Sequence, residues 1–205
     1  MKARIAVVYH SGYGHTAKQA QSVAEGAQSV PDTHVDLLSL NELSEGLFKT
    51  IDAADAVIMG SPTYMSGSSA VFRRFVEATS AAWGDNLRWR DKVAGGFTNS
   101  GCMSGDKLQT LVEMALFAAQ HGMIWVGMAS FGGWNTSSGS SEDLNRLGSW
   151  LGAMAQSNND QGGDVAPPAS DLRTAAALGK RIAEVTHTYI EGRASKKAAR
   201  TPQQS

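Results

Sequence analysis

Hydroxyl-bearing residues and glycines occur together at residues 11–16, Ser-Gly-Tyr-Gly-His-Thr, between an apolar run and a segment with helical spacing. Unpaired backbone N–H groups and the helix dipole favour an anion at such a helix start. Gly12 and Gly14 would let the backbone turn tightly and approach a ligand. Ser11 and Thr16 can donate hydroxyl hydrogen bonds to that ligand. An ordinary strand-to-helix turn capped by Thr16 would use the same residues, so the later loops decide between the two interpretations.

The loop lacks the features of two common nucleotide-binding motifs. A nucleoside triphosphatase needs a lysine before the final hydroxyl residue, and His15 stands there instead. The dinucleotide fingerprint needs a third glycine, whereas Ala17 stands in its place and no acidic ribose ligand follows at a suitable distance.

Apolar runs and amphipathic segments alternate along the chain. Strands are predicted at 5–9, 35–38, 56–60, 93–97 and 123–126, with helices at 17–27, 71–79, 106–121 and 170–190. This alternation predicts a parallel sheet covered by helices on both faces. In such a sheet ligands bind at the carboxyl ends of the strands, where three loops would converge on one crevice. No periodicity is evident in residues 127–168, and the polar, basic composition from residue 192 onward predicts disorder.

The first loop resembles the phosphate loop of flavodoxins. Further segments resemble the WrbA-type NAD(P)H:quinone oxidoreductases of the flavodoxin-like superfamily, namely 60–67, 73–77 with Trp83, 97–101, 120–123 and 162–164. The similarity extends from Ile5 to about Ile190. Two features depart from that family, because the segment after the second strand is shorter and Tyr64 stands where an arginine is usual. The related NAD(P)H-dependent FMN-reductase-like flavoproteins are therefore the alternative subfamily.

The resemblance implies a flavodoxin-like, doubly wound, five-stranded parallel sheet of order 2-1-3-4-5. One FMN-binding domain would occupy residues 1–191, followed by a disordered tail at 192–205. Three loops would hold FMN: Ser11, Gly12, Tyr13, Gly14, His15 and Thr16; Pro62, Thr63, Tyr64, Met65, Ser66 and Gly67; and Thr98, Asn99, Ser100 and Gly101. The second loop suits a flat ring, because Pro62 stiffens its entry and Gly67 permits close approach.

The resemblance also places two further side chains at the flavin pocket as candidate catalytic residues. Trp83 would stack on a planar quinone or nicotinamide. His121 would hydrogen-bond a quinone oxygen or donate a proton. Each has a structural alternative, since a tryptophan at a helix end often packs against the core and a histidine at a helix C-terminus often caps it.

Composition limits the other possibilities. The chain has 18 basic and 19 acidic residues and a net charge of −1, so no strong field favours nucleic acid or an anionic membrane. Its single cysteine, Cys102, fits a reducing compartment. No apolar run approaches the roughly 20 residues that span a bilayer, and no signal segment precedes the first strand, so a cytoplasmic location is expected. The five histidines show no metal-ligand spacing.

These observations predict an FMN-dependent oxidoreductase. NADH or NADPH would reduce a quinone or similar acceptor by two electrons in a ping-pong cycle, because no separate nucleotide motif accompanies the three loops. The resemblance also implies a homodimer or homotetramer. Two alternatives remain: a flavodoxin-type electron carrier, against which the near-neutral charge argues, and an FMN-binding redox sensor without substrate turnover.

Overall fold

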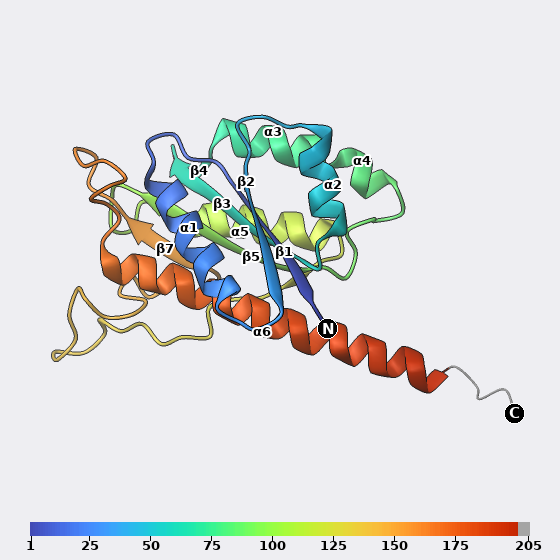
Figure 1. Ribbon diagram of the computed structural model, residues 1–205. Coiled ribbons are helices and arrows are strands. Elements are labelled where there is room, and N and C mark those ends of the chain that lie inside the picture. The colour runs from blue at the N-terminus through green and yellow to red at the C-terminus, as the bar shows by residue number, and fades with distance from the viewer. Residues whose placement is uncertain (201–205) are drawn as a thin grey trace, which may run out of the picture.

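The computed structural model describes residues 1–200. A parallel sheet forms its centre, with helices on both faces (Figure 1). In β1 (Ala3–Tyr9), Ile5 and Val7 face one core and Ala6 and Val8 face the other. Because alternate side chains of a strand point to opposite faces, a stretch buried on both sides is apolar throughout, as residues 5–8 of β1 are, while Arg4 before them is exposed.

The strand order confirms the predicted 2-1-3-4-5 arrangement. The sheet runs β2-β1-β3-β5-β6, with β2 at Thr33–Ser39, β3 at Ala56–Tyr64, β5 at Val93–Ser100 and β6 at Ile124–Trp125. All of these neighbouring strands pair in parallel. The carboxyl ends of β1, β3 and β5 therefore lie at one edge of the sheet, as the sequence predicts.

Two short strands were not predicted. β4 (Gly67–Ser68) pairs antiparallel with the end of β3, which turns the expected loop into a hairpin. β7 (Ala153–Gln156) pairs in parallel with the second half of β5, whereas β6 pairs only with its first two residues. The fifth position of the sheet is thus filled by two strands. The chain between them, 126–152, leaves the sheet and returns to it. The short β7 has no continuous apolar run that would have predicted it.

Within residues 1–200, six helices connect and cover the strands. They are α1 (His15–Gln28), α2 (Glu45–Ala53), α3 (Ala70–Ala78), α4 (Ser80–Gly84), α5 (Lys107–Gln120) and α6 (Ala169–Arg200). α6 continues past its expected end near Ile190, so residues 192–200 are helical where a disordered tail was expected. This stretch is rich in alanine, lysine and arginine, which favour helix even without burial. Residues 201–205 of the expected tail lie outside the described residues.

The packing of α1 on α6 positions the start of α1. Glycines permit this contact: a Cβ on Gly26 would overlap the carbonyl oxygen of Ala176, and one on Gly179 would overlap that of Val23. Both obstacles are helix backbone, which cannot move aside as a flexible side chain can. The two helices therefore lie closer together than alanine would allow.

Gly179→Ala should lower the melting temperature, because overpacking of this kind costs about 1–3 kcal/mol. Gly192→Ala, in the same helix, is the matched control, because a Cβ on Gly192 would meet no neighbouring group of the described chain within 4 Å. That control should raise stability slightly, by about 0.5–1 kcal/mol, because alanine is the better helix former. Thermal unfolding of both variants measures the difference, and equal melting temperatures would contradict the close packing.

His121 lies in the apolar core at the amino end of β5. Its ring stacks on Trp89 at 5.0 Å, and its Nε2 lies 3.0 Å from Thr79 Oγ1. That hydroxyl already donates to the carbonyl of Val76, so the imidazole Nε2–H is the donor. Its Nδ1 is buried without a partner among the described residues. Burial lowers the pKa of His121 below its usual 6.5, because protonation would leave a charge that nothing compensates.

Trp83 lies at the same end of the molecule. It is 48% exposed near the end of α4, just before the turn that leads into β5. The carbonyl of Gly122, beside His121, accepts a hydrogen bond from Asp91 N–H, immediately before β5 begins. At about 3.3 Å per residue, β5 separates this end from its carboxyl edge by about 20 Å.

The buried imidazole predicts a pH dependence. Since the pKa of His121 is lower in the folded state, the unfolded state binds more protons below pH 6.5 and stability falls as the pH drops. His121→Gln should lower stability at pH 7.5 by about 1–3 kcal/mol through the lost buried contacts. It should also lose less further stability between pH 7.5 and pH 5.5 than the wild type does. His10, whose pKa burial also lowers, remains in the variant and keeps part of the slope. Denaturant unfolding at the two pH values tests this, and an unchanged slope would refute it.

Candidate functional site

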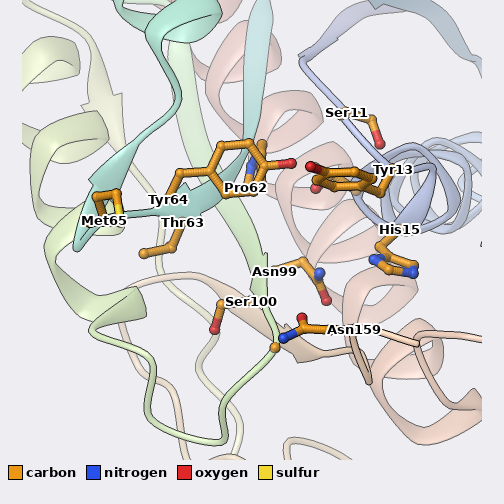
Figure 2. A pocket seen from close by; sticks show the side chains of 13 residues that line it. Ser11, Tyr13, His15, Pro62, Thr63, Tyr64, Met65, Asn99, Ser100 and Asn159 are labelled. Carbon is orange, nitrogen blue, oxygen red and sulfur yellow. The ribbon is translucent and has the colours of Figure 1, made fainter. Parts of the chain in front are cut away.

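A cavity of about 580 Å³ opens at the carboxyl ends of β1, β3 and β5. Its lining comprises Ser11, Gly12, Tyr13, His15, Thr16, Pro62, Thr63, Tyr64, Met65, Asn99, Ser100, Gly101 and Asn159 (Figure 2). The three predicted loops therefore converge on one cavity. Among these lining residues there is no lysine, arginine, aspartate or glutamate, so any charge on a ligand must be met by amides, hydroxyls, the imidazole of His15 and helix dipoles.

The loop before α1 leaves its amides free. Gly14 is the N-cap in the left-handed conformation, with φ 91°, and its N–H donates to Ser11 Oγ at 3.1 Å. Lys18 N–H makes the first helical bond, to the carbonyl of Gly14 at 3.0 Å. The amides between these two residues have no helical acceptor and lie at the positive end of the dipole. The nearly buried hydroxyl of Thr16 lines the same place, which makes it a site for an anion.

Two tyrosines form one side of the cavity. The rings of Tyr13 and Tyr64 meet edge to face, with centroids 6.3 Å apart and planes at 71° (Figure 2). A Cβ on Gly12 would overlap the hydroxyl of Tyr64, so the Tyr64 side chain can cross the first loop in this position only where that loop has no Cβ. Burial, followed by the neighbouring Tyr13, raises the pKa of Tyr64 above 10, and a backbone hydrogen bond from Gly12 opposes the shift. Tyr64 is therefore a neutral aromatic wall at neutral pH.

The β3–β4 hairpin carries Tyr64 to this position. Its two central residues, Met65 and Ser66, have φ of 48° and 67°, the left-handed pair that a tight two-residue hairpin requires. Such angles in residues other than glycine are strained, and strain of this kind concentrates at functional sites. Glu113 of α5 accepts a hydrogen bond of 2.6 Å from Ser68 Oγ and holds the hairpin in place.

A buried chain of hydroxyls joins the second and third loops. Thr63 Oγ1 lies 2.8 Å from Thr98 Oγ1 and 2.8 Å from Thr110 Oγ1. The chain links the ends of β3 and β5 to α5 and fixes the width of the cavity between them. Thr98 thus supports the site through this chain and does not line the cavity. Gly14, Ser66 and Gly67, which were also predicted, do not line it either.

The segment after β7 closes the remaining side. Asn99 Oδ1 accepts from Ser157 Oγ at 2.9 Å, and Ser157 N–H donates to the carbonyl of Ser100 at 3.1 Å. Asn159 lies so close to Gly101 that a Cβ there would overlap its amide. Asn159 is the lining residue that the sequence interpretation missed.

The same segment also contacts the first loop. His15 Nε2 lies 2.7 Å from the carbonyl of Gln161. The backbones of Gly14 and Gly163 approach closely, since a Cβ on Gly163 would lie 2.9 Å from the carbonyl carbon of Gly14. The consecutive glycines 162 and 163 were the sequence feature that could have indicated this contact. They lie far from Gly14 along the chain, so the sequence alone did not show that the two segments meet.

The structure does not bring Trp83 and His121 to this cavity. Neither residue lines it, and both lie at the opposite end of β5. His121 is a core residue whose side chain bonds Thr79 and stacks on Trp89, so it neither lines the cavity nor caps the helix carbonyls.

Other kinds of site find no basis in the described residues. Residues 1–200 contain no group of three or more histidine, cysteine, aspartate or glutamate side chains arranged to hold a metal ion. Within the same part of the chain, no helix is long and apolar enough to cross a membrane.

The donor set of the cavity fits FMN. The free amides at the start of α1, with Ser11 and Thr16, suit a terminal phosphate. The paired tyrosines and the backbone at residues 99–101 suit a flat ring with polar edges. The volume lies within the roughly 300–1,000 Å³ usual for cofactor sites.

Comparison with known proteins agrees with this assignment. The family model described as NADPH-dependent FMN reductase matches residues 10–136. Flavodoxin FldP of Pseudomonas aeruginosa is 40% identical over 183 residues, which cover 89% of this chain and 96% of the relative. An NAD(P)H dehydrogenase (quinone) of Archaeoglobus fulgidus is 33% identical over 205 residues, covering 89% of this chain and 97% of the relative.

Solved structures show the same relationship. The crystal structure of a WrbA-like flavodoxin from Agrobacterium tumefaciens shares 38% identity and a TM-score of 0.71, covering 92% of this chain and 99% of that one. The chain therefore belongs to the NADPH-dependent FMN reductase family, as a WrbA-type oxidoreductase of the flavodoxin-like superfamily with FMN as its cofactor.

Proposed function

We propose that this protein reduces quinones or related acceptors by two electrons at the expense of NADH or NADPH, in a ping-pong cycle. The observation that carries the proposal is the convergence of three loops on one cavity with an anion site at one end and an aromatic wall beside it. Several relatives, including those of Archaeoglobus fulgidus and Paracoccus denitrificans, are named NAD(P)H dehydrogenase (quinone). Acceptance of a hydride from nicotinamide and its delivery to the acceptor are the chemistry that bound FMN supplies.

The chain's own residues bind the cofactor and orient it in the cavity. The amides before Lys18, with Ser11 and Thr16, hold the phosphate, which anchors the cofactor at one end. Tyr13 and Tyr64 present apolar faces that exclude water from one side of the ring. The lining groups that could donate a proton to the acceptor are the imidazole of His15 and the hydroxyls of Tyr13 and Tyr64, with water as the alternative donor. Donor and acceptor would enter in turn, because one cavity serves both.

An electron carrier is the second candidate. The 40% identity with a protein named flavodoxin favours it, while the net charge of −1 gives little electrostatic attraction for a redox partner. The two candidates differ in whether NAD(P)H itself delivers electrons. We also infer a homodimer or homotetramer, in line with the WrbA-type assignment.

Ser11→Ala together with Thr16→Ala should strip most of the FMN from the purified protein. Each lost hydrogen bond to a charged group costs about 1.5–3 kcal/mol, so the double variant should bind FMN at least ~100-fold more weakly. Thr188→Ala with Ser195→Ala is the control, because those hydroxyls bond to helix carbonyls of α6 away from the cavity. Flavin content per folded chain is the measurement. Equal flavin content in the two double variants would show that the first loop is not the phosphate site.

Anaerobic mixing with NADH or NADPH should bleach the flavin absorbance, and benzoquinone should then restore it. Steady-state rates at several fixed quinone concentrations should give parallel double-reciprocal lines, since the first product leaves before the second substrate binds. The control is the phosphate-site double variant, which should lose turnover and flavin together. Bleaching by dithionite but by neither nucleotide would reject the enzyme and leave the electron carrier.

A further inference from the structure

Lys107 is a completely buried lysine at the first residue of α5. Its Nζ donates to Ser100 Oγ at 2.9 Å, to the carbonyl of Cys102 at 2.6 Å and to the carbonyl of Met103 at 2.9 Å. These three acceptors use all three N–H groups of the ammonium. A buried charge is tolerated only with such hydrogen bonds, and none of the three acceptors is a carboxylate.

The three acceptors lie at the end of β5, where Ser100 is the last residue, and in the loop that follows it. Ser100 lines the cavity, while Cys102 and Met103 continue the loop outward. The chain then turns back through Gly105 and Asp106, both left-handed with φ near 54° and 53°, before α5 begins. A Cβ on Gly105 would overlap Ser100 Oγ, so the loop closes tightly around the lysine head group. An apolar side chain would fill the same space but would leave the loop carbonyls without a donor.

Lys107 also brings a positive charge to the wall of the cavity, because its Nζ donates to Ser100, which lines the cavity. The lining itself contains no lysine, arginine, aspartate or glutamate, and Lys107 stands one hydrogen bond behind Ser100. Beyond it, Arg146 and Asp171 form a buried ion pair with Nε 2.7 Å from Oδ1, so their charges offset each other. Burial lowers the pKa of Lys107 to about 8; Asp171 and Cys102 oppose the shift and Arg146 adds to it. The side chain is therefore largely protonated at pH 7.

We propose that Lys107 is a positioning residue that tunes the cofactor: its ammonium holds the Ser100–Met103 loop against the cavity and raises the reduction potential of bound FMN. A flavin gains electron density on reduction, so a fixed cation behind the cavity wall stabilises that state more than the oxidised one. The inference rests on the assignment of the cavity to FMN. It does not depend on which donor or acceptor the enzyme uses.

A second lysine beside the same strand provides a matched control. Lys92 immediately precedes β5, at the end far from the cavity, and its Nζ donates to the carbonyls of Asp52, at 2.9 Å, and Ala54. Burial lowers the pKa of Lys92 as well. Both lysines thus donate to backbone carbonyls, Lys107 from a fully buried and Lys92 from a half-buried position, and they lie at opposite ends of β5.

The test compares Lys107→Met, Lys107→Gln and Lys92→Met with the wild type as FMN-loaded proteins. The two-electron midpoint potential is measured with an electrode and mediator dyes, the FMN dissociation constant by fluorescence, and unfolding by denaturant. Lys107→Met should favour the oxidised over the reduced cofactor by on the order of tenfold, which equals a potential lowered by about 30 mV, and should weaken FMN binding. Lys107→Gln keeps a donor for the loop, so it should lower the potential with a smaller loss of FMN affinity.

Lys92→Met should lower stability without moving the potential. A wild-type potential in either Lys107 variant, or an equal shift in Lys92→Met, would overturn the proposal. If Lys107→Met does not fold, the midpoint potential of Lys107→Gln tests the proposal in its place. Because the electrode replaces NAD(P)H, a protein that proves to be an electron carrier still gives a valid result. Failure of the wild type to bind FMN would refute the cofactor assignment itself.

Discussion

The unpaired amides at the start of α1 are the constraint on which the site depends. They exist because α1 begins directly after the loop that follows β1, at the carboxyl edge of the sheet. Parallel pairing of β1 with β3, and of β3 with β5, then brings two further loops to the same edge. The anion site thus follows from the order of the strands. The close packing of α1 on α6 at Gly26 and Gly179 fixes where those amides point.

The walls of the cavity are held mainly from outside it. Polar side chains of α5 bind the β3–β4 hairpin through Glu113 and the strand ends through Thr110. Lys107 binds the loop after β5 from within, and Ser157 braces its other side. Such supports reduce the conformational freedom of each loop before a ligand arrives. Preorganisation of this kind favours tight binding, because less ordering remains to be done.

The sequence predicted those parts of the site that are local in the chain. Each of the three loops, 11–16, 62–67 and 98–101, lies where a strand ends. Their glycine, proline and hydroxyl residues can be recognised in the sequence without knowledge of the tertiary structure. Asn159 could not be found in this way, because it reaches the cavity only after β7 returns the chain to the edge of β5. The sequence gives no sign of β7 itself, because this strand has only four residues and they form no apolar run.

The placement of Trp83 and His121 shows a different limit. Resemblance assigned them to the pocket by their order in the chain, but α5 carries its last residue back to the amino end of the sheet. There the imidazole stacks on Trp89 and donates to Thr79 as part of the core. Periodicity identified the helix correctly and could not show that its C-terminal histidine faces the interior.

Recognition of a terminal phosphate by the start of α1 is the central claim. Titration of flavin-free protein with FMN, riboflavin and FAD, followed by fluorescence, measures this recognition directly. Two or more charge-assisted hydrogen bonds to the phosphate predict that FMN binds at least ~100-fold more tightly than riboflavin. FAD, whose phosphate is esterified and less charged, should also bind more weakly than FMN. Equal affinity for riboflavin and FMN would contradict the claim.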